Sequence, residues 1–200
     1  MKYILFILLS LNCFSQKNSK AQYLFDENDQ LISQDQFKNK LNDKKIELIT
    51  YEIDTAFIGR FLKKKDIGIL SSSEKIKIYN ALQNISTKKI DDSKTIIINF
   101  FYKDNPEPNG SCIDYYVTDK AYRKFLENNT SLNQFFITEK NYDYKNKNVY
   151  QDKNDIIRAT LFKYKFACGN YIIIHPNGNF YRKLGEYKQE EIPQNLINIE

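Results

Sequence analysis

The sequence predicts an α/β fold with a mixed central sheet, and three observations lead to this prediction. Residues 95–102 form an apolar run of β-branched and aromatic side chains, interrupted mainly by Asn99, which is typical of a strand covered on both faces. Residues 170–176 read as a second strand that passes through an Asn177-Gly178 turn into a return strand at 180–184. Helical patterns separate these strands and indicate crossover connections.

The N-terminus predicts an export signal. Residues 1–15 combine one early positive charge at Lys2, an apolar run too short to span a bilayer, and small residues at Cys13 and Ser15. Cleavage after Ser15 would begin the mature protein at Gln16. The expected location is therefore the periplasm or the medium of a bacterial cell. A lipoprotein with its lipid anchor on Cys13 is the alternative, and it would sit at the cell envelope.

Residues 16–44 are predicted to form an N-terminal α/β arm. Two short apolar pieces, residues 23–25 and 31–32, flank turn-forming residues and indicate a small hairpin. Ser33 followed by Gln36 matches a capping box, so a short helix should come next.

Residues 45–200 are assigned to one α/β domain, which opens with three short strands and a helix. The expected strands are residues 46–53, 57–62 and 67–70. The serines at 71–73 and Glu74 indicate where the helix begins. Three-residue spacing predicts one buried stripe on this helix, made of Ile76, Tyr79, Leu82 and Ile85.

The second part of this domain alternates helices and strands. Capping residues indicate two helix starts, at Thr118 or Asp119 and at Asp152 or Asn154. A short strand is expected at residues 134–138, and a final helix within residues 190–199. The order from residue 95 onward is therefore strand, helix, strand, helix, strand, hairpin partner strand, helix.

This order of elements resembles the thioredoxin-like superfamily over residues 91–200. In that family an apolar strand leads into the redox loop and a long helix, and a later strand ends in a turn before the closing hairpin strand. Residues 95–101 look like the first strand, and Ile172-Ile-Ile-His-Pro-Asn-Gly178 looks like the second with its turn. The resemblance implies a thioredoxin-like three-layer sandwich with a mixed central sheet.

The expected mature chain keeps two cysteines, Cys112 and Cys168. Export implies an oxidising compartment, so a disulfide between them is the simplest prediction. The family geometry would also bring the two cysteines close together, at the corner where related enzymes hold their redox pair. The resemblance therefore implies that this corner is closed by a structural disulfide.

The catalytic residues of the family are missing at two places. Cys112-Ile-Asp-Tyr115 has a tyrosine where the second redox cysteine belongs, and Ala167-Cys168-Gly169 stands where the family places a cis-proline. We therefore expect a non-catalytic binding or scaffolding module, stapled by one disulfide. The alternative is a thiol-disulfide oxidoreductase with Cys112 as nucleophile and Cys168 as resolving cysteine.

Charge and motifs argue against several other function classes. The net charge is +5, and the densest basic run, residues 63–65, is expected to be a solvated edge, so no nucleic-acid partner is expected. His175 is the only histidine, and it lies too far along the strand from Cys168 to act as its general base or to bind a metal ion together with it. The acidic loop at 104–110 lacks the glutamate that ends a calcium-binding loop, so no calcium site is expected there.

No cofactor and no metal are therefore expected, and no later apolar run is long enough for a membrane helix. The partner is expected to be an unidentified protein or small ligand. Three tyrosines are the candidates for an exposed contact surface: Tyr115, Tyr116 and Tyr181.

Overall fold

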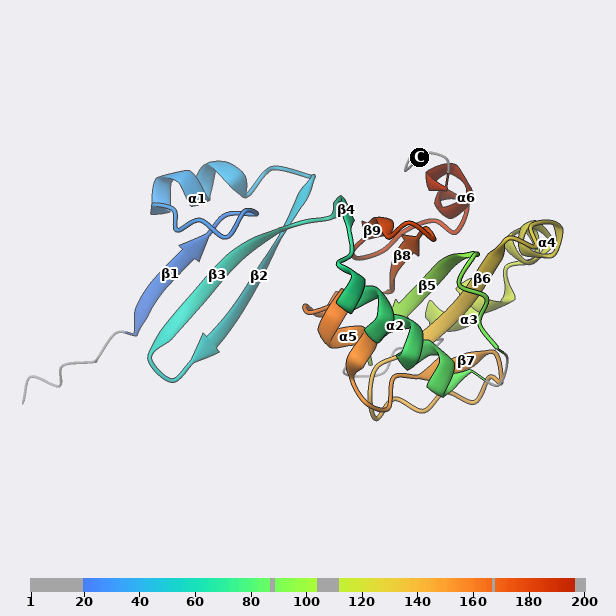
Figure 1. The fold of residues 1–200 in the computed structure, drawn as a ribbon. Helices are drawn as coiled ribbons and strands as arrows, with labels where there is room; N and C mark the ends of the chain where they lie inside the picture. The colour runs from blue at the N-terminus through green and yellow to red at the C-terminus, as the bar shows by residue number, and fades with distance from the viewer. Residues whose placement is uncertain (1–19, 87–88, 104–111, 167, 197–200) are drawn as a thin grey trace, which may run out of the picture. The chain divides into compact units, whose positions relative to one another are not determined.

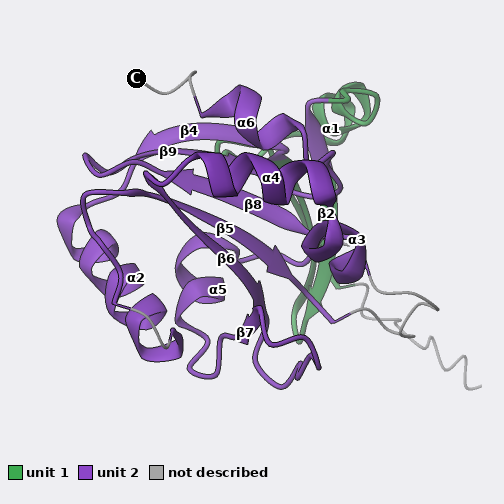
Figure 2. Cartoon of the chain, turned by 90° about the vertical axis from the view of Figure 1, so that its right-hand side faces the viewer, with its two compact units in different colours: residues 1–44, 48–62 green, residues 45–47, 63–200 purple. Residues whose placement is uncertain are grey.

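The structure is a computed structural model that describes residues 20–86, 89–103, 112–166 and 168–196. The predicted signal peptide, the alternative lipid site at Cys13 and the acidic loop at 104–110 lie outside the described residues. The chain divides into two compact units (Figure 2). Unit 1 comprises residues 1–44 and 48–62, and unit 2 comprises residues 45–47 and 63–200.

Unit 1 is built on a three-stranded sheet in the order β1-β3-β2 (Figure 1). Its elements are β1 (Ala21–Phe25), α1 (Gln34–Lys40), β2 (Ile46–Ile53) and β3 (Ala56–Lys63). The predicted hairpin is present as an antiparallel bridge between Phe25 and Leu31, and β1 also pairs in parallel with β3. The Ser33 capping box is confirmed at the start of α1.

The predicted domain boundary lies between residues 44 and 45, which assigns β2 and β3 to the second domain. In the structure both strands belong to the three-stranded sheet, and only Ile46 and Glu47 of β2 and Lys63 of β3 fall in unit 2. The reason is the β1–β3 pairing, in which residues 21–25 align with residues 56–60. Such a long-range parallel pairing leaves no local mark in the sequence.

Unit 2 contains a mixed six-stranded sheet in the order β4-β9-β8-β5-β6-β7. The strands are β4 (Lys65–Ile69), β5 (Thr95–Phe101), β6 (Leu132–Thr138), β7 (Val149–Gln151), β8 (Asn170–Ile174) and β9 (Asn179–Lys183). Strand β5 pairs in parallel with β6 and antiparallel with β8, and β8 continues antiparallel into β9. Gly178, with φ at 93°, supplies the positive φ in the turn that joins β8 and β9.

Helices cover both faces of this sheet. Helices α2 (Ser72–Ile85) and α5 (Ile156–Leu161) lie on one face, and the other face carries α3 (Cys112–Thr118), α4 (Lys120–Asn128) and α6 (Glu191–Asn195) (Figure 2). The predicted α/β class is confirmed, because a mixed central sheet lies between two layers of helices. The element order from residue 95 is also as predicted, with α3 and β7 added.

The alternation of β5 divides the core of unit 2 into two layers. Residues 97 and 101 belong to the cluster that includes side chains of α3, α4 and α6. The neighbouring residue Phe100 points to the opposite face, where its ring stacks on Phe162 with centroids 4.9 Å apart. Because all of residues 96–101 are buried, the prediction of a strand covered on both faces is confirmed.

The predicted stripe on α2 is correct at Leu82, which is buried, and wrong at Ile76. Ile76 is 61% exposed, whereas Ile78, Ala81 and Leu82 are buried. The buried face therefore follows the i, i+3, i+4 positions of an α-helix. A strict three-residue repeat drifts around the helix and leaves its first member in solvent.

Two elements were not predicted at all. Helix α3 begins at Cys112, where the sequence predicted no helix. Strand β7 has only three residues, 149–151, and pairs in parallel with the last three residues of β6. Within the described part of the chain, no helix is long and apolar enough to cross a membrane.

Candidate functional site

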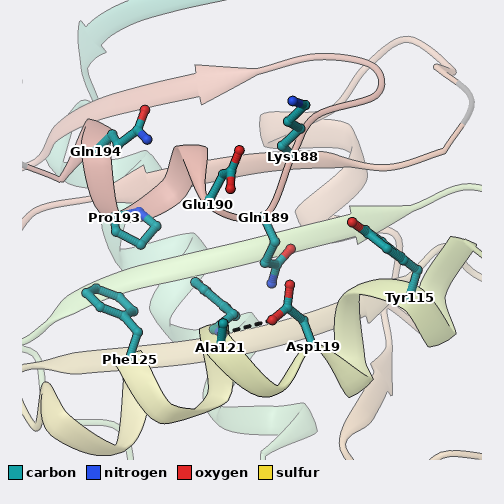
Figure 3. A pocket seen from close by; sticks show the side chains of 10 residues that line it. Tyr115, Asp119, Ala121, Phe125, Lys188, Gln189, Glu190, Pro193 and Gln194 are labelled. Atoms are coloured by element: carbon teal, nitrogen blue, oxygen red, sulfur yellow. Dashed lines mark hydrogen bonds between the residues drawn. The ribbon is translucent and has the colours of Figure 1, made fainter.

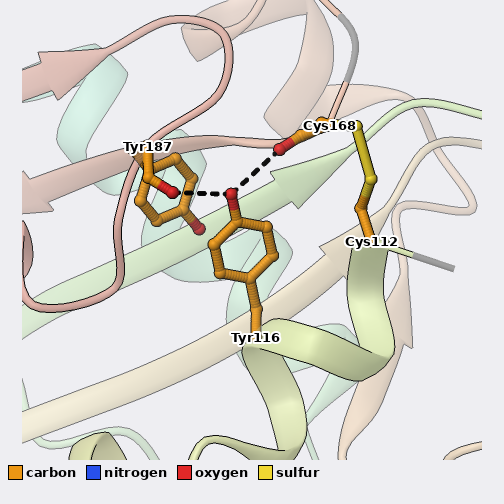
Figure 4. The surroundings of a disulfide bond; sticks show 4 residues. All are labelled: Cys112, Tyr116, Cys168 and Tyr187. Atoms are coloured by element: carbon orange, nitrogen blue, oxygen red, sulfur yellow. Dashed lines mark hydrogen bonds between the residues drawn. A yellow bond between two sulfur atoms is a disulfide. The ribbon is translucent and has the colours of Figure 1, made fainter.

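The candidate site is a corner of unit 2 where a disulfide joins two distant segments (Figure 4). Cys112 is the first residue of α3, and Cys168 lies just before β8, 56 positions further along the chain. Their Cα atoms are 5.5 Å apart, which is a usual separation for bonded cysteines. The predicted disulfide is thus present, and both cysteines are half-buried.

Tyr116 ties this corner to the C-terminal part of the chain. It lies one helical turn after Cys112, and its hydroxyl donates to the carbonyl oxygens of Cys168 at 3.2 Å and Tyr187 at 2.8 Å (Figure 4). Its ring stacks on the ring of Tyr187 with centroids 4.5 Å apart. Burial raises the pKa of the Tyr116 phenol to about 12, so it remains a neutral donor.

A chain of side-chain hydrogen bonds, half-buried at Gln134 and fully buried at Asn99, runs beneath the corner. The Tyr122 hydroxyl donates to Gln134 Oε1 at 2.6 Å, and Gln134 Nε2 donates to Asn99 Oδ1 at 2.7 Å. Asn99 Nδ2 in turn donates to the Tyr187 hydroxyl. Burial raises the pKa of the Tyr187 phenol well above its ordinary value. The network therefore consists of neutral groups that fix one another's orientation.

The backbone at the disulfide turns through two residues with positive φ. Cys168 has φ at 54° and Gly169 at 98°. A Cβ atom on Gly169 would lie 3.2 Å from the Phe101 ring, 3.3 Å from the Tyr187 ring and 3.4 Å from the Tyr116 ring. Glycine is therefore required here both for its conformation and for close packing of aromatic rings.

The other residues singled out in the sequence lie apart from this corner or differ from expectation. His175 follows the far end of β8, where its Nδ1 is 3.4 Å from Thr95 Oγ1. Of the three tyrosines expected to be exposed, only Tyr115 is, at 66%. Tyr116 and Tyr181 are buried because they belong to the aromatic core of unit 2.

A pocket of about 570 Å³ opens beside the corner, between α4 and the segment that leads into α6 (Figure 3). Its apolar lining includes Tyr115, Phe125 and Pro193, and charged side chains stand around it at Asp119, Lys188 and Glu190. Gln189 also lines the pocket and is only 2% exposed. Neither amide atom of Gln189 has a hydrogen-bond partner among the described residues.

The arrangement offers two kinds of chemistry. The disulfide can be reduced and re-formed, or it can serve only to hold α3 against the segment before β8. The pocket can bind a ligand with both polar and apolar groups. Among the residues that the structure describes, no group of three or more His, Cys, Asp and Glu side chains is placed to hold a metal ion.

Sequence reasoning found the two cysteines but missed the residues around them. Asn99 and Gln134 carried a usable signal, because each is an uncharged polar residue within an apolar strand. Tyr187 and Gln189 carried none, since they lie in a polar stretch after the last hairpin. Only the tertiary structure shows that the backbone of residues 185–190 brings Tyr187 and Gln189 to the site.

Comparisons with known proteins identify no family. No protein-family model matches this chain, and no curated protein sequence matches it. Among solved structures, the chain is similar to one described as MTB dsbF in its mixed oxidized and reduced forms. The likeness has a TM-score of 0.37 and 13% identity, and covers 53% of this chain and 81% of that one. A likeness at this score does not identify the family of the chain.

Proposed function

We propose that this protein is an exported, non-catalytic binding module of thioredoxin-like fold, in which the Cys112–Cys168 disulfide is a structural staple. One observation carries the proposal. The bond closes a corner that Tyr116 already holds through its hydrogen bonds to the carbonyls of Cys168 and Tyr187. Breaking the bond would therefore disturb packed structure, whereas a working redox pair must open and close repeatedly.

The neighbourhood of Cys112 supports the same role. An oxidoreductase of this superfamily resolves its mixed disulfide with a second cysteine three residues after the first. Here that position is Tyr115, whose side chain is exposed. The bonded partner comes instead from the segment before β8, where Cys168 adopts a left-handed backbone conformation. That segment would have to relax and re-form in every catalytic cycle.

The proposed location rests on the N-terminal sequence. An export signal in residues 1–15 would deliver the protein to an oxidising compartment, where the disulfide persists. Cleavage after Ser15 would release the protein into the periplasm or the medium. Mass spectrometry of the mature N-terminus tests this: a chain that begins at Gln16 supports it, and a lipid-modified Cys13 would establish the anchored form instead.

The redox role is tested by measuring free thiols and the reduction potential of the purified protein against a series of thiol buffers. A structural staple should show no free thiol at Cys112 or Cys168. Its potential should lie below about −300 mV, which the glutathione pool does not reduce. The protein should also fail to reduce or oxidise a model disulfide substrate any faster than the Cys112→Ser/Cys168→Ser double variant.

The opposite results would favour the thiol-disulfide oxidoreductase. These are a potential between about −120 and −270 mV, the range of dedicated thiol oxidoreductases, together with turnover that the double variant loses. A Cys112→Ser variant that abolishes turnover and a Cys168→Ser variant that traps a mixed disulfide would then assign the nucleophile and the resolving cysteine.

A further inference from the structure

The pocket between α4 and α6 contains an unusual buried group. Gln189 is 2% exposed, and neither its Oε1 nor its Nε2 forms a hydrogen bond with any described residue. Buried amides in folded proteins almost always have partners, because burial without them costs free energy. An amide that faces a cavity and lacks partners in the free protein is therefore a candidate for binding a ligand.

The amide points into the pocket from the segment that precedes α6. Figure 3 shows the Gln189 side chain reaching toward the start of α4, where Asp119 and Ala121 lie. The Asp119 carboxylate is already engaged, since its Oδ1 accepts the backbone N–H of Tyr122 at 2.9 Å and caps α4. The cavity of about 570 Å³ is of the size that holds a small ligand or a short piece of polypeptide.

The functional groups of the pocket restrict the chemistry of its ligand. A glutamine side chain offers one acceptor and one double donor side by side, which matches a group that carries both an N–H and a C=O. Phe125, Pro193 and the exposed ring of Tyr115 supply apolar contact area next to it. A peptide unit with an apolar side chain satisfies both requirements.

The charges around the pocket argue against anionic ligands. The residues that line it include two carboxylates, Asp119 and Glu190, and one ammonium group, Lys188. A nucleotide also offers paired donors and acceptors, but its phosphates would meet this net negative lining. A ligand that ends in a free carboxylate meets the same repulsion. An uncharged segment within a polypeptide does not.

We infer that the pocket between α4 and α6 binds an uncharged, extended peptide segment, with the Gln189 amide paired to one peptide group and an apolar side chain against Phe125 and Pro193. This inference rests on the proposed binding function and specifies its ligand class. It places recognition beside the disulfide corner, on residues that take no part in the bond itself.

The test uses the whole protein as the cell produces it, with the disulfide intact, and N-acetyl-phenylalanine-N-methylamide as the probe. Binding is followed by chemical shifts of the backbone and of the Gln189 side-chain NH₂. We expect shifts confined to the pocket and saturating with probe concentration. Gln189→Met, which keeps the length of the side chain and removes its amide, should weaken binding about tenfold, the loss of roughly one hydrogen-bonded pair.

Gln194→Leu is the matched control, because it removes an exposed amide at the rim of the same pocket and should change the affinity less than twofold. The stability of the free protein is a second readout. Since the Gln189 amide has no partner among the described residues, Gln189→Met should unfold at the same denaturant concentration as the wild type or higher. A clear loss of stability would mean that the amide serves the fold, and would overturn the inference.

Two further probes separate the alternatives. If adenosine binds in the pocket and N-acetyl-phenylalanine-N-methylamide does not, the ligand is a nucleobase and the inference of a peptide ligand is overturned. N-acetyl-phenylalanine with a free carboxylate should bind more weakly than the methylamide, and equal binding would contradict the charge argument. If the methylamide does not bind but the disulfide proves resistant to reduction, this inference alone fails. If the methylamide binds but the disulfide has an oxidising potential, only the non-catalytic role fails.

Discussion

Asn99 is a fully buried polar side chain on a central strand of the six-stranded sheet, so its burial must be offset by hydrogen bonds. Its amide uses both ends: Oδ1 accepts from Gln134, and Nδ2 donates to the hydroxyl of Tyr187. An apolar residue would remove both bonds, and the buried Tyr187 hydroxyl would lose the amide that donates to it. Satisfied in this way, Asn99 specifies how the segment after the last hairpin lies across the sheet.

Tyr116→Phe removes the hydroxyl that holds the corner together. The ring and its stacking on Tyr187 remain, but the carbonyls of Cys168 and Tyr187 lose a donor. We expect the free energy of unfolding to fall by about 1–2 kcal/mol, the usual cost of losing a buried hydrogen bond. Urea denaturation measures this. Tyr115→Phe, at the exposed neighbouring ring, is the control and should change stability by less than about 0.5 kcal/mol.

The same phenol predicts how stability depends on high pH. Burial raises the pKa of Tyr116 to about 12 in the folded protein, above its value of roughly 10 in an unfolded chain. The folded state therefore binds more protons between these values. Its contribution to stability is fully present below about pH 10 and is lost as the pH rises toward 12.

Denaturation curves from pH 8 to 12 check this expectation. The Tyr116→Phe variant should lose stability less steeply above pH 10 than the wild type. Other buried tyrosines with raised pKa values, such as Tyr122 and Tyr171, contribute to both curves, so the difference between them isolates Tyr116. If stability falls equally steeply with pH in the wild type and in Tyr116→Phe, Tyr116 does not have the raised pKa expected of it.

At the scale of elements, helix α2 shows how a local motif positions a larger layer. Ser71 and Glu74 form a reciprocal capping box at its start, and Lys75 donates to the carbonyl of Pro176 in the β8–β9 turn. The helix is thus anchored at its first turn to the hairpin, and its buried face packs on the sheet. The capping box at Ser33 was predicted from the sequence, whereas at Ser71 the sequence indicated only the start of the helix.

Ser71→Ala should lower the free energy of unfolding by about 1 kcal/mol, the usual cost of losing an N-cap. It should also raise the pKa of Glu74, which the Ser71 side chain and backbone N–H now lower by hydrogen bonding to its carboxylate. Because that pKa is lowered in the folded state, its contribution is present near neutral pH and is lost as the pH falls through the acidic range.

Urea denaturation at neutral pH and an NMR titration of the Glu74 carboxyl provide the two measurements. Ser72→Ala, at the adjacent exposed serine, is the matched control. If the Glu74 pKa is the same in Ser71→Ala as in the wild type, the Ser71–Glu74 capping box does not form in solution.

At the scale of the whole molecule, the chain consists of two compact units, and both cysteines belong to unit 2. Joining residues 56 positions apart restricts the unfolded chain, which in the chain-entropy model stabilises by about 4 kcal/mol at most. The bond links the start of α3 to the entry of β8. Its effect should therefore be confined to the unit that contains it.

The Cys112→Ser/Cys168→Ser double variant should unfold unit 2 more readily, by up to about 4 kcal/mol, and leave unit 1 unchanged. Native-state hydrogen exchange resolves the two units residue by residue. Protection should fall for amides of β5 and β8 and stay constant for β1 and β3. An equal loss of protection in both units would mean that they unfold as one cooperative body, contrary to this expectation.

The sequence by itself determined the element order from residue 95 apart from α3 and β7, and the burial of β5 on both faces. It also determined the hairpin with its glycine turn, the capping box at Ser33 and the start of α2 near Ser71. These depend on periodicity and turn chemistry within a few neighbouring residues. Only the tertiary structure decided the β1–β3 pairing, the register of α2, the contacts of Tyr116 and the pocket at Gln189. Asn99 and Tyr187 are 88 positions apart, and no local pattern encodes a contact over that separation. It arises because the sheet and the helices on it bring the two segments together.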